Sequence, residues 1–156
     1  MDKETRAIYA ELSKPFGKGA VKSPPKGKYG NYVEHSMVRQ KMIALFGNFD
    51  ESIPYHLKET LTNPKTQETK QVLVGCTYRL TVEINGVKVT KESTGVCEHP
   101  FNWNSDAERL KVAEADGFKR VCMKLGVALH LYANEDFILH DILKSDEQVS
   151  SDTEEE

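Results

Sequence analysis

The run VLVGCTYRLTVEINGVKV, residues 72–89, decides the fold class of this 156-residue chain. It consists of a long stretch rich in β-branched and aromatic residues, then Asn85-Gly86, then a second apolar run. An Asn-Gly pair between two such runs is the strongest short-range signal for a β-hairpin. The sequence therefore predicts two antiparallel strands, at about 71–84 and 87–97, joined at Asn85-Gly86.

One more strand is predicted before the hairpin, at about residues 53–61. The segment TNPKT, residues 62–66, follows it and is typical of a turn, because Pro64 suits the second position of a β-turn. Together with the hairpin, this strand is expected to make a three-stranded antiparallel meander.

Helices are predicted on both sides of the meander. Ser105 and Glu108 form the S-x-x-E capping box that begins the longest of them. Phe118, Cys122 and Leu125 then recur at i, i+4 and i+7, so this face is expected to pack on the sheet. The predicted helices cover residues 4–12, 33–46, 105–124 and 134–143. The fold class is therefore predicted to be α+β: a helix, an antiparallel β-β-β meander and a long helix packed across the sheet.

The segment from Leu12 to Lys41 is strongly basic, with seven Lys and Arg residues and Glu34 as its one acid. Within it, residues 13–30 contain Pro24-Pro25 and four glycines, which predict a loop. A basic segment of this kind is a candidate footprint for an anionic partner. The alternative is a solvated lysine-rich loop without a partner.

The acids of the chain are concentrated at its end. Residues 145–156 hold six acids and no base, whereas the whole chain has 21 Lys and Arg and 24 Asp and Glu. The chain without this segment therefore carries a formal charge of +3, against −3 for the whole. We expect a core domain over residues 1–144 and a disordered acidic tail over 145–156.

Motifs for nucleotide hydrolysis, metal binding and nuclease chemistry are weak. The Gly-Lys runs FGKGA and KGKYG lack the spacing of a phosphate-binding loop and its magnesium-binding hydroxyl. Cys76, Cys97 and His99 would need a fourth ligand to hold zinc, and Cys76 is better explained as a small packed residue. The polar residues scattered without a catalytic motif are Glu98, His99, Asp136, His140 and Asp141. No enzymatic activity and no cofactor are therefore predicted.

The expected compartment is the cytoplasm. The start, MDKETRAIYAEL, has no apolar core of a secretory signal, and no run of 18 apolar residues predicts a membrane span. The three cysteines are odd in number and lack C-x-x-C spacing, which favours a reducing environment.

Two groups of basic residues are candidate nucleic-acid contacts. The run KGKYGNY, residues 26–32, sets Lys26 and Lys28 beside two tyrosines, of which Tyr32 could equally be a packing residue at the start of a helix. Lys119 and Arg120 are adjacent on the long predicted helix, although Asp116 and Arg120 at i, i+4 also suit a surface ion pair. The residues by themselves therefore predict an α+β domain that can bind anions.

Three motifs in order resemble the Rad-fifty-two-type single-strand annealing proteins. The long predicted helix fits the family pattern K-x-A-x-[ST]-D-[AG]-[FL]-K-R, with Ala115 at the [ST] position, and LGVAL at 125–129 follows it. The run YVEHSMVRQKMIALFG, residues 32–47, and LSKPF, residues 12–16, resemble the two earlier motifs. The fitting helix positions are Lys111, Ala113, Asp116, Gly117, Phe118, Lys119 and Arg120. The resemblance covers about residues 12–132.

The resemblance implies a protein that binds single-stranded DNA and anneals complementary strands without ATP, in homologous recombination and DNA repair. It implies homo-oligomeric rings or arcs formed edge to edge by the sheets, and a phage or bacterial origin, hence the host cytoplasm. Lys119 and Arg120 match the paired basic DNA contacts, and Lys111 a basic position on the same helix. Tyr32 matches a groove aromatic, and Lys22 lies near a family arginine. A further family arginine is Met123 here, where Lys124 is a candidate substitute.

Two other function classes compete with this one. The basic loop of a non-enzymatic, oligomeric interaction module would bind acidic protein partners, and a metal-dependent nuclease ranks below that. The acidic tail is a candidate for recruiting a strand-binding protein or an exonuclease, or it is a solubilising tail.

Overall fold

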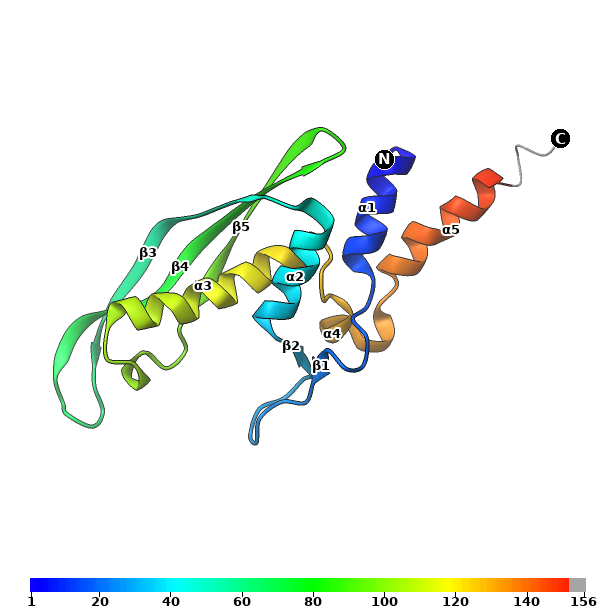
Figure 1. Cartoon of the computed structure of the whole chain (residues 1–156). Coiled ribbons are helices and arrows are strands. Elements are labelled where there is room, and N and C mark those ends of the chain that lie inside the picture. The colour runs from blue at the N-terminus through cyan, green and yellow to red at the C-terminus, as the bar shows by residue number, and fades with distance from the viewer. Residues whose placement is uncertain (152–156) are drawn as a thin grey trace. The chain divides into compact units, whose positions relative to one another are not determined.

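The computed structural model of the chain describes residues 1–151 and confirms the α+β class (Figure 1). Its described residues form two compact units. We call residues 49–82 and 90–121 the sheet unit, and residues 1–48, 83–89 and the described part from 122 onward the helical unit. The elements are α1 (Lys3–Ser13), β1 (Val21–Lys22), β2 (Tyr32–Val33), α2 (His35–Phe46), β3 (Asp50–Thr62), β4 (Thr69–Ile84), β5 (Val87–Val96), η1 (Pro100–Asn102), α3 (Asp106–Met123), α4 (His130–Ala133), η2 (Asn134–Asp136) and α5 (Leu139–Ser151).

The predicted meander is confirmed, with strand order β3-β4-β5. β4 and β5 are joined at Asn85 and Gly86, whose φ angles of 49° and 77° are the positive values that a type I′ turn requires. β3 and β4 pair antiparallel with two register shifts, one between Ser52 and Tyr55 and one after Leu57. Such bulges bend a strand and increase its twist.

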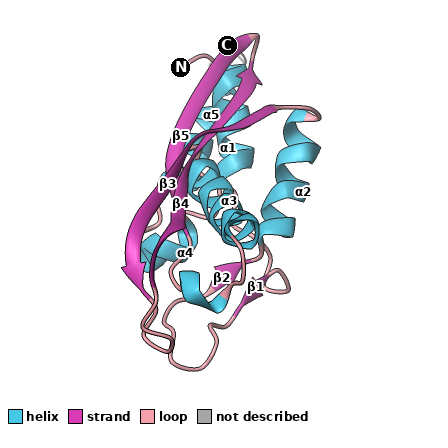
Figure 2. Cartoon of the chain, turned by 90° about the vertical axis from the view of Figure 1, so that its left-hand side faces the viewer, coloured by secondary structure: helices cyan, strands magenta, loops and turns pink. Residues whose placement is uncertain are grey.

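Helix α3 covers one face of this sheet in both views (Figures 1 and 2). In the sheet unit, Tyr78 and Leu80 of β4 are buried together with Phe118 and Val121 of α3. The rings of Tyr78 and Phe118 meet edge to face, with centroids 6.0 Å apart. The predicted sheet-packing role of Phe118 is therefore confirmed. Cys122 is also buried, while Leu125 follows the end of the helix at Met123.

Gly95 and Gly117 allow α3 to lie directly on the strands, and Gly75 allows β4 and β5 to approach closely beneath it. A Cβ atom on Gly95 would lie 1.9 Å from the carbonyl oxygen of Ala113, and one on Gly117 would lie 2.8 Å from Cβ of Tyr78. Gly75 of β4 is equally restricted, because its Cβ would lie 2.5 Å from the carbonyl oxygen of Gly95. Real Cβ atoms do not approach other atoms so closely, so helix–sheet contact at this point depends on glycine.

In the helical unit, α1 and α5 lie side by side (Figure 1). The Nδ1 atom of His140 donates to the carbonyl oxygen of Ala10 over 2.9 Å. Gly126 follows the end of α3, with a φ of 102° and an N–H that donates to the Met123 carbonyl over 2.9 Å. The His140 bond therefore joins α5 to α1.

Two predictions in this unit are wrong. The loop predicted over 13–30 contains β1, which pairs antiparallel with β2: Val21 lies opposite Val33, and Lys22 opposite Tyr32. Because Tyr32 and Val33 extend to form β2, α2 begins at His35 instead of residue 33. The short strands escape a periodicity search, which needs at least four residues to detect alternation.

The C-terminal helix also differs from its prediction. A helix is predicted over 134–143, but Asn134 has a φ of 50°, residues 134–136 form η2, and α5 begins at Leu139. The predicted domain end at residue 144 falls inside α5, which continues to Ser151. Residues 145–151 of the predicted disordered tail are therefore helical, and residues 152–156 lie outside the described residues.

Among the described helices, none combines the length and the apolar character needed to cross a lipid bilayer.

Candidate nucleic-acid interface

The predicted site residues fall into two groups, one in each unit. The α3 group belongs to the sheet unit and consists of Lys111, Lys119 and Arg120. The hairpin group belongs to the helical unit and consists of Lys22, Lys26, Lys28 and Tyr32. Each group is built by different local contacts.

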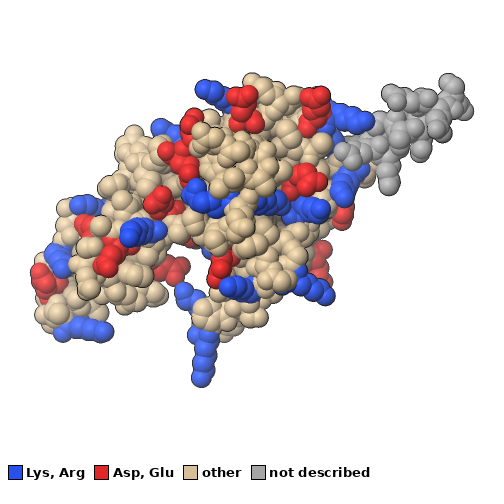
Figure 3. Space-filling model, in the orientation of Figure 1, with Lys and Arg blue, Asp and Glu red and all other residues tan. Residues whose placement is uncertain are grey.

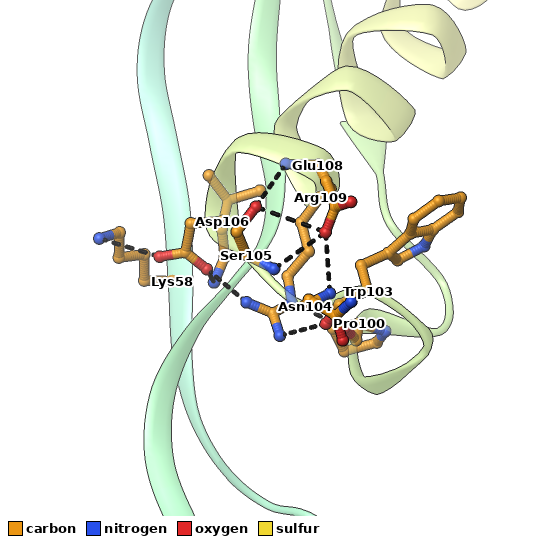
Figure 4. Close-up of polar contacts among 9 residues, drawn as sticks. Lys58, Pro100, Trp103, Asn104, Ser105, Asp106, Glu108 and Arg109 are labelled. Atoms are coloured by element: carbon orange, nitrogen blue, oxygen red, sulfur yellow. Dashed lines mark hydrogen bonds and ion pairs between the residues drawn. The ribbon is translucent and has the colours of Figure 1, made fainter.

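The start of α3 is held by the predicted capping box. The backbone N–H of Glu108 donates to the Ser105 hydroxyl over 3.2 Å, and Glu108 Oε2 accepts from the Ser105 N–H over 3.1 Å (Figure 4). Two of the N–H groups that a helix start leaves unpaired are thereby satisfied. This part of the prediction is confirmed.

A buried arginine, which the sequence does not predict, fixes the same helix start. Arg109 is 4% exposed and donates to the carbonyl oxygens of Pro100 and Trp103 over 2.7 and 2.8 Å. It also pairs with Asp106 over 2.9 Å (Figure 4). A buried guanidinium needs such partners, because an unpaired buried charge is very costly. These carbonyl oxygens come together around Arg109 only in the folded chain, so no sequence motif predicts their hydrogen bonds.

Asp106 ties the helix start to two strands. Its Oδ1 accepts from the Leu73 N–H of β4 over 3.0 Å, and its Oδ2 lies 3.4 Å from Nζ of Lys58 on β3. The Leu73 N–H, with Arg109 and Lys58, holds the pKa of Asp106 below its usual value. The charged carboxylate therefore persists at neutral pH, and α3 is positioned against β3 and β4.

Within the motif DGFKR at 116–120, the first three residues have structural roles. Asp116 Oδ2 accepts from the Val96 N–H and from Nε of Arg120, each over 2.9 Å. Gly117 makes the close approach to Tyr78, and Phe118 is fully buried. Lys119 and Arg120 are the residues of the motif that reach the surface, and the Arg120 side chain is 49% exposed.

The basic residues of α3 do not form one stripe. Successive residues of an α-helix are rotated by about 100°, so Lys119 and Arg120 point to different flanks. Lys111 is nine positions before Arg120 and lies about half a turn around the axis from it. Lys111 is therefore not brought together with Arg120 on one helix face. On the face in Figure 3, basic side chains are interspersed with acidic ones over the sheet unit.

The base of the β1–β2 hairpin carries a paired lysine. Nζ of Lys22 lies 2.6 Å from Oε1 of Glu34, and both side chains are about half exposed. The hydrogen bond to Glu34 and the charge of this carboxylate raise the pKa of Lys22. Glu34 thus competes with any anion for Lys22, although salt and solvent screen such exposed pairs.

The loop of the hairpin, residues 23–31, is the most accessible basic site. Tyr29 is 100% exposed, and Lys26 and Lys28 beside it are also exposed. Their side chains make no hydrogen bond or ion pair within the described part of the chain. Figure 3 shows basic side chains projecting from this loop. Tyr32 is partly buried at the paired base, so Tyr29 is the aromatic at the tip.

The thiols do not assemble into the zinc site considered above. Cys76, Cys97 and Cys122 are free and buried, and burial raises the pKa values of Cys76 and Cys97. Among the side chains that the structure describes, no cluster of three or more His, Cys, Asp and Glu could hold a metal ion. The two thiols are therefore protonated, packed groups at neutral pH.

Neither a known protein-family model nor a curated protein matches this sequence.

Proposed function

We propose that this protein binds single-stranded DNA and anneals complementary strands without ATP. The hairpin tip is the observation that carries the proposal. Lys26 and Lys28 are exposed and make no ion pair with the described residues, and they shortly precede Tyr29, whose ring is fully exposed. Ammonium groups bind phosphates, and an exposed aromatic ring stacks on any base, so the combination suits a single strand of any sequence.

The α3 group supports a contact of its own with a single strand. Asp116 holds the Arg120 guanidinium by its Nε atom, which leaves the terminal nitrogens available for a phosphate. Contacts with phosphates carry little sequence information. Bases that are not held in this way remain available to pair with a second strand, which is what annealing requires.

Assembly of subunits would multiply these contacts along one strand. β3 and β5 are the edge strands of the three-stranded sheet. Unpaired strand edges are templates for pairing with another chain. We therefore propose a homo-oligomer, a ring or an arc, in which the β3 edge of one copy pairs with the β5 edge of the next.

Fluorescence anisotropy of a labelled, mixed-sequence single-stranded oligonucleotide tests the proposal. The affinity should fall steeply as the salt concentration rises from about 50 to 200 mM, because lysines that bind phosphates displace the counterions condensed on the strand. Replacing Lys26 and Lys28 by alanine should lower the slope of log K against log salt by about 1.4, since each single-strand phosphate contact contributes about 0.7. The purified protein should also anneal two complementary strands without ATP.

The competing functions give different results in the same assays. If the protein binds polyglutamate and does not bind the oligonucleotide, it is a module that binds acidic proteins. Cleavage of the strand that depends on magnesium would identify a nuclease. Either result, without annealing, would overturn the proposal.

A further inference from the structure

The helical unit contains an open pocket of about 410 Å³. This volume falls in the range of pockets that hold small organic ligands. Its walls come from the segment after α1, from the two ends of the β1–β2 hairpin, from α4 and from the start of η2. The lining residues are Phe16, Lys18, Val21, Asn31, His130, Leu131 and Asn134.

One wall of the pocket is aromatic. The rings of Phe16 and His130 have centroids 6.2 Å apart, and Phe137 contacts the His130 ring edge to face at 6.0 Å. Nζ of Lys41 lies 4.9 Å from the centroid of Phe16 and donates to the Lys14 carbonyl over 2.9 Å. The Phe16 ring is thus held by neighbours, and a fixed ring is a good surface for stacking a flat ligand.

The imidazole ring of His130 lines the pocket and its hydrogen-bonding capacity is not satisfied. Both ring nitrogens are buried and have no hydrogen-bond partner among the described residues. Burial, assisted by the charge of Lys41, lowers the pKa of His130, so the ring is neutral at neutral pH. A neutral imidazole carries one donor and one acceptor. Buried polar groups are normally satisfied, and a ligand with both kinds of group could satisfy this ring after a turn about χ2.

The remaining lining suits a nucleotide. The side-chain amides of Asn31 and Asn134 each carry a donor and an acceptor, the pattern that reads the edge of a base. Lys18 is exposed at the rim, where its ammonium group can meet a phosphate. The apolar side chains of Val21 and Leu131 complete the walls.

The pocket is continuous with the basic hairpin. Val21 directly precedes Lys22, and Asn31 directly precedes Tyr32, so the two hairpin strands connect the pocket to the Lys26–Tyr29 loop. Lys18 lines the pocket itself, so a strand that follows the hairpin can reach the pocket with a phosphate near this ammonium group. This continuity favours a nucleotide of the bound strand over an unrelated small molecule.

We propose that this pocket takes one unstacked base of the single strand that the hairpin binds, with the base against Phe16 and its edge toward Asn31 and Asn134. The inference rests on the proposed function. It adds that each subunit holds one base as a fixed point along the strand, while neighbouring bases face outward for pairing.

The test compares two oligonucleotides of equal length, one with all its bases and one whose central nucleotides are abasic. The full-length chain should bind the base-bearing strand about fivefold or more tightly, in line with the stacking of a base on an aromatic side chain. Phe16→Leu and Asn31→Ala should each reduce this ratio and leave the salt slope unchanged. Asn31 is exposed, so Asn31→Ala preserves the test if Phe16→Leu does not fold. Tyr29→Ala serves as the control for stacking at the loop tip.

The outcomes separate the pocket from the proposed function. Salt-dependent binding with the same base-to-abasic ratio in both pocket variants and the parent would overturn the pocket and leave strand binding intact. Loss of the ratio in Tyr29→Ala alone would also overturn it, since the base would then be stacked at the loop tip. Failure of both oligonucleotides to bind would overturn strand binding and the pocket together.

Discussion

Gly95 of β5 and Ala113 of α3 are packed so closely that a Cβ atom on Gly95 would lie 1.9 Å from the Ala113 carbonyl oxygen. The obstructing atom belongs to the helix backbone, which cannot turn aside as a flexible side chain does. The same contact brings Gly117 over Tyr78 and so determines how α3 presents Lys119 and Arg120. The position of the α3 group therefore depends on a glycine outside it.

Replacing Gly95 by alanine should destabilise the protein by about 3 kcal/mol, at the upper end of overpacking costs, because α3 must move off the sheet. Urea denaturation followed by circular dichroism measures the free energy of unfolding. Gly19→Ala is the matched control: a Cβ atom there meets nothing within 4 Å, so its effect should stay within about 0.5 kcal/mol. Equal stabilities of the two variants would contradict the packing described.

Replacing Asp116 by asparagine should raise the affinity for single-stranded DNA about threefold, because Arg120 loses its competing carboxylate. The asparagine oxygen can still accept from the Val96 N–H, so the free energy of unfolding should change by about 0.5 kcal/mol or less. Glu68→Gln, in the exposed β3–β4 turn, removes the same charge without touching Arg120. Equal gains in the two variants, measured by anisotropy, would show that Arg120 does not contact the strand.

The parts of the fold that were predictable depend on local chemistry. Asn85-Gly86 can form a tight hairpin turn wherever it occurs, and Ser105 with Glu108 satisfies a helix start within one turn of chain. The β1–β2 pairing was not predictable, because each strand has two residues and its partner lies across a loop of nine residues. The same holds for Arg109, whose carbonyl partners become neighbours only in the folded chain.

The candidate site was predictable in composition and not in arrangement. The spacing in DGFKR correctly suggested the Asp116–Arg120 pair, and the sequence also identified the basic loop. Helix geometry, however, separates Lys111 from Arg120, and Glu34 pairs with Lys22. In the pocket beside the hairpin, the rings of Phe16 and His130 are neighbours, although more than a hundred residues separate them in the sequence. No local sequence pattern predicts such a contact.

Stability should depend on pH through Lys41. Burial lowers the pKa of Lys41 to about 8, against an ordinary value of 10.5, with Glu11 opposing the shift and Lys14 adding to it. Between these values the unfolded chain binds the proton and the folded chain does not, so this residue makes stability rise as pH increases from about 8 to 10.5. Lys41→Met should lack that rise. Denaturation of both proteins at pH 7.5 and 9.5 measures the difference, and parallel pH profiles would contradict the assignment.

The β5 edge offers a test of assembly. Cys97 donates its N–H to Val74 of β4 over 2.8 Å, so the N–H of the preceding Val96 points away from β4, where Asp116 covers it. Two residues earlier, the Thr94 N–H has the same outward direction. Thr94→Pro should therefore block pairing of this edge with another copy without breaking the sheet. Light scattering after size-exclusion chromatography should show that the Thr94→Pro variant forms smaller particles than the parent protein. Particles of unchanged size would show that the β5 edge does not join one copy to the next.

The central claim is that this protein binds single-stranded DNA through its basic residues and anneals complementary strands, and that Lys119 and Arg120 of α3 are required contacts beside the hairpin. The most direct measurement is oligonucleotide binding and ATP-free annealing by the double variant Lys119→Ala, Arg120→Ala. The control is Lys65→Ala, Lys70→Ala, which removes two exposed charges from the β3–β4 turn region of the same unit. Circular dichroism first establishes that both variants are folded. We then predict that the α3 variant loses binding and annealing, while the control variant retains them. Annealing by a folded α3 variant at the rate of the control would contradict the account.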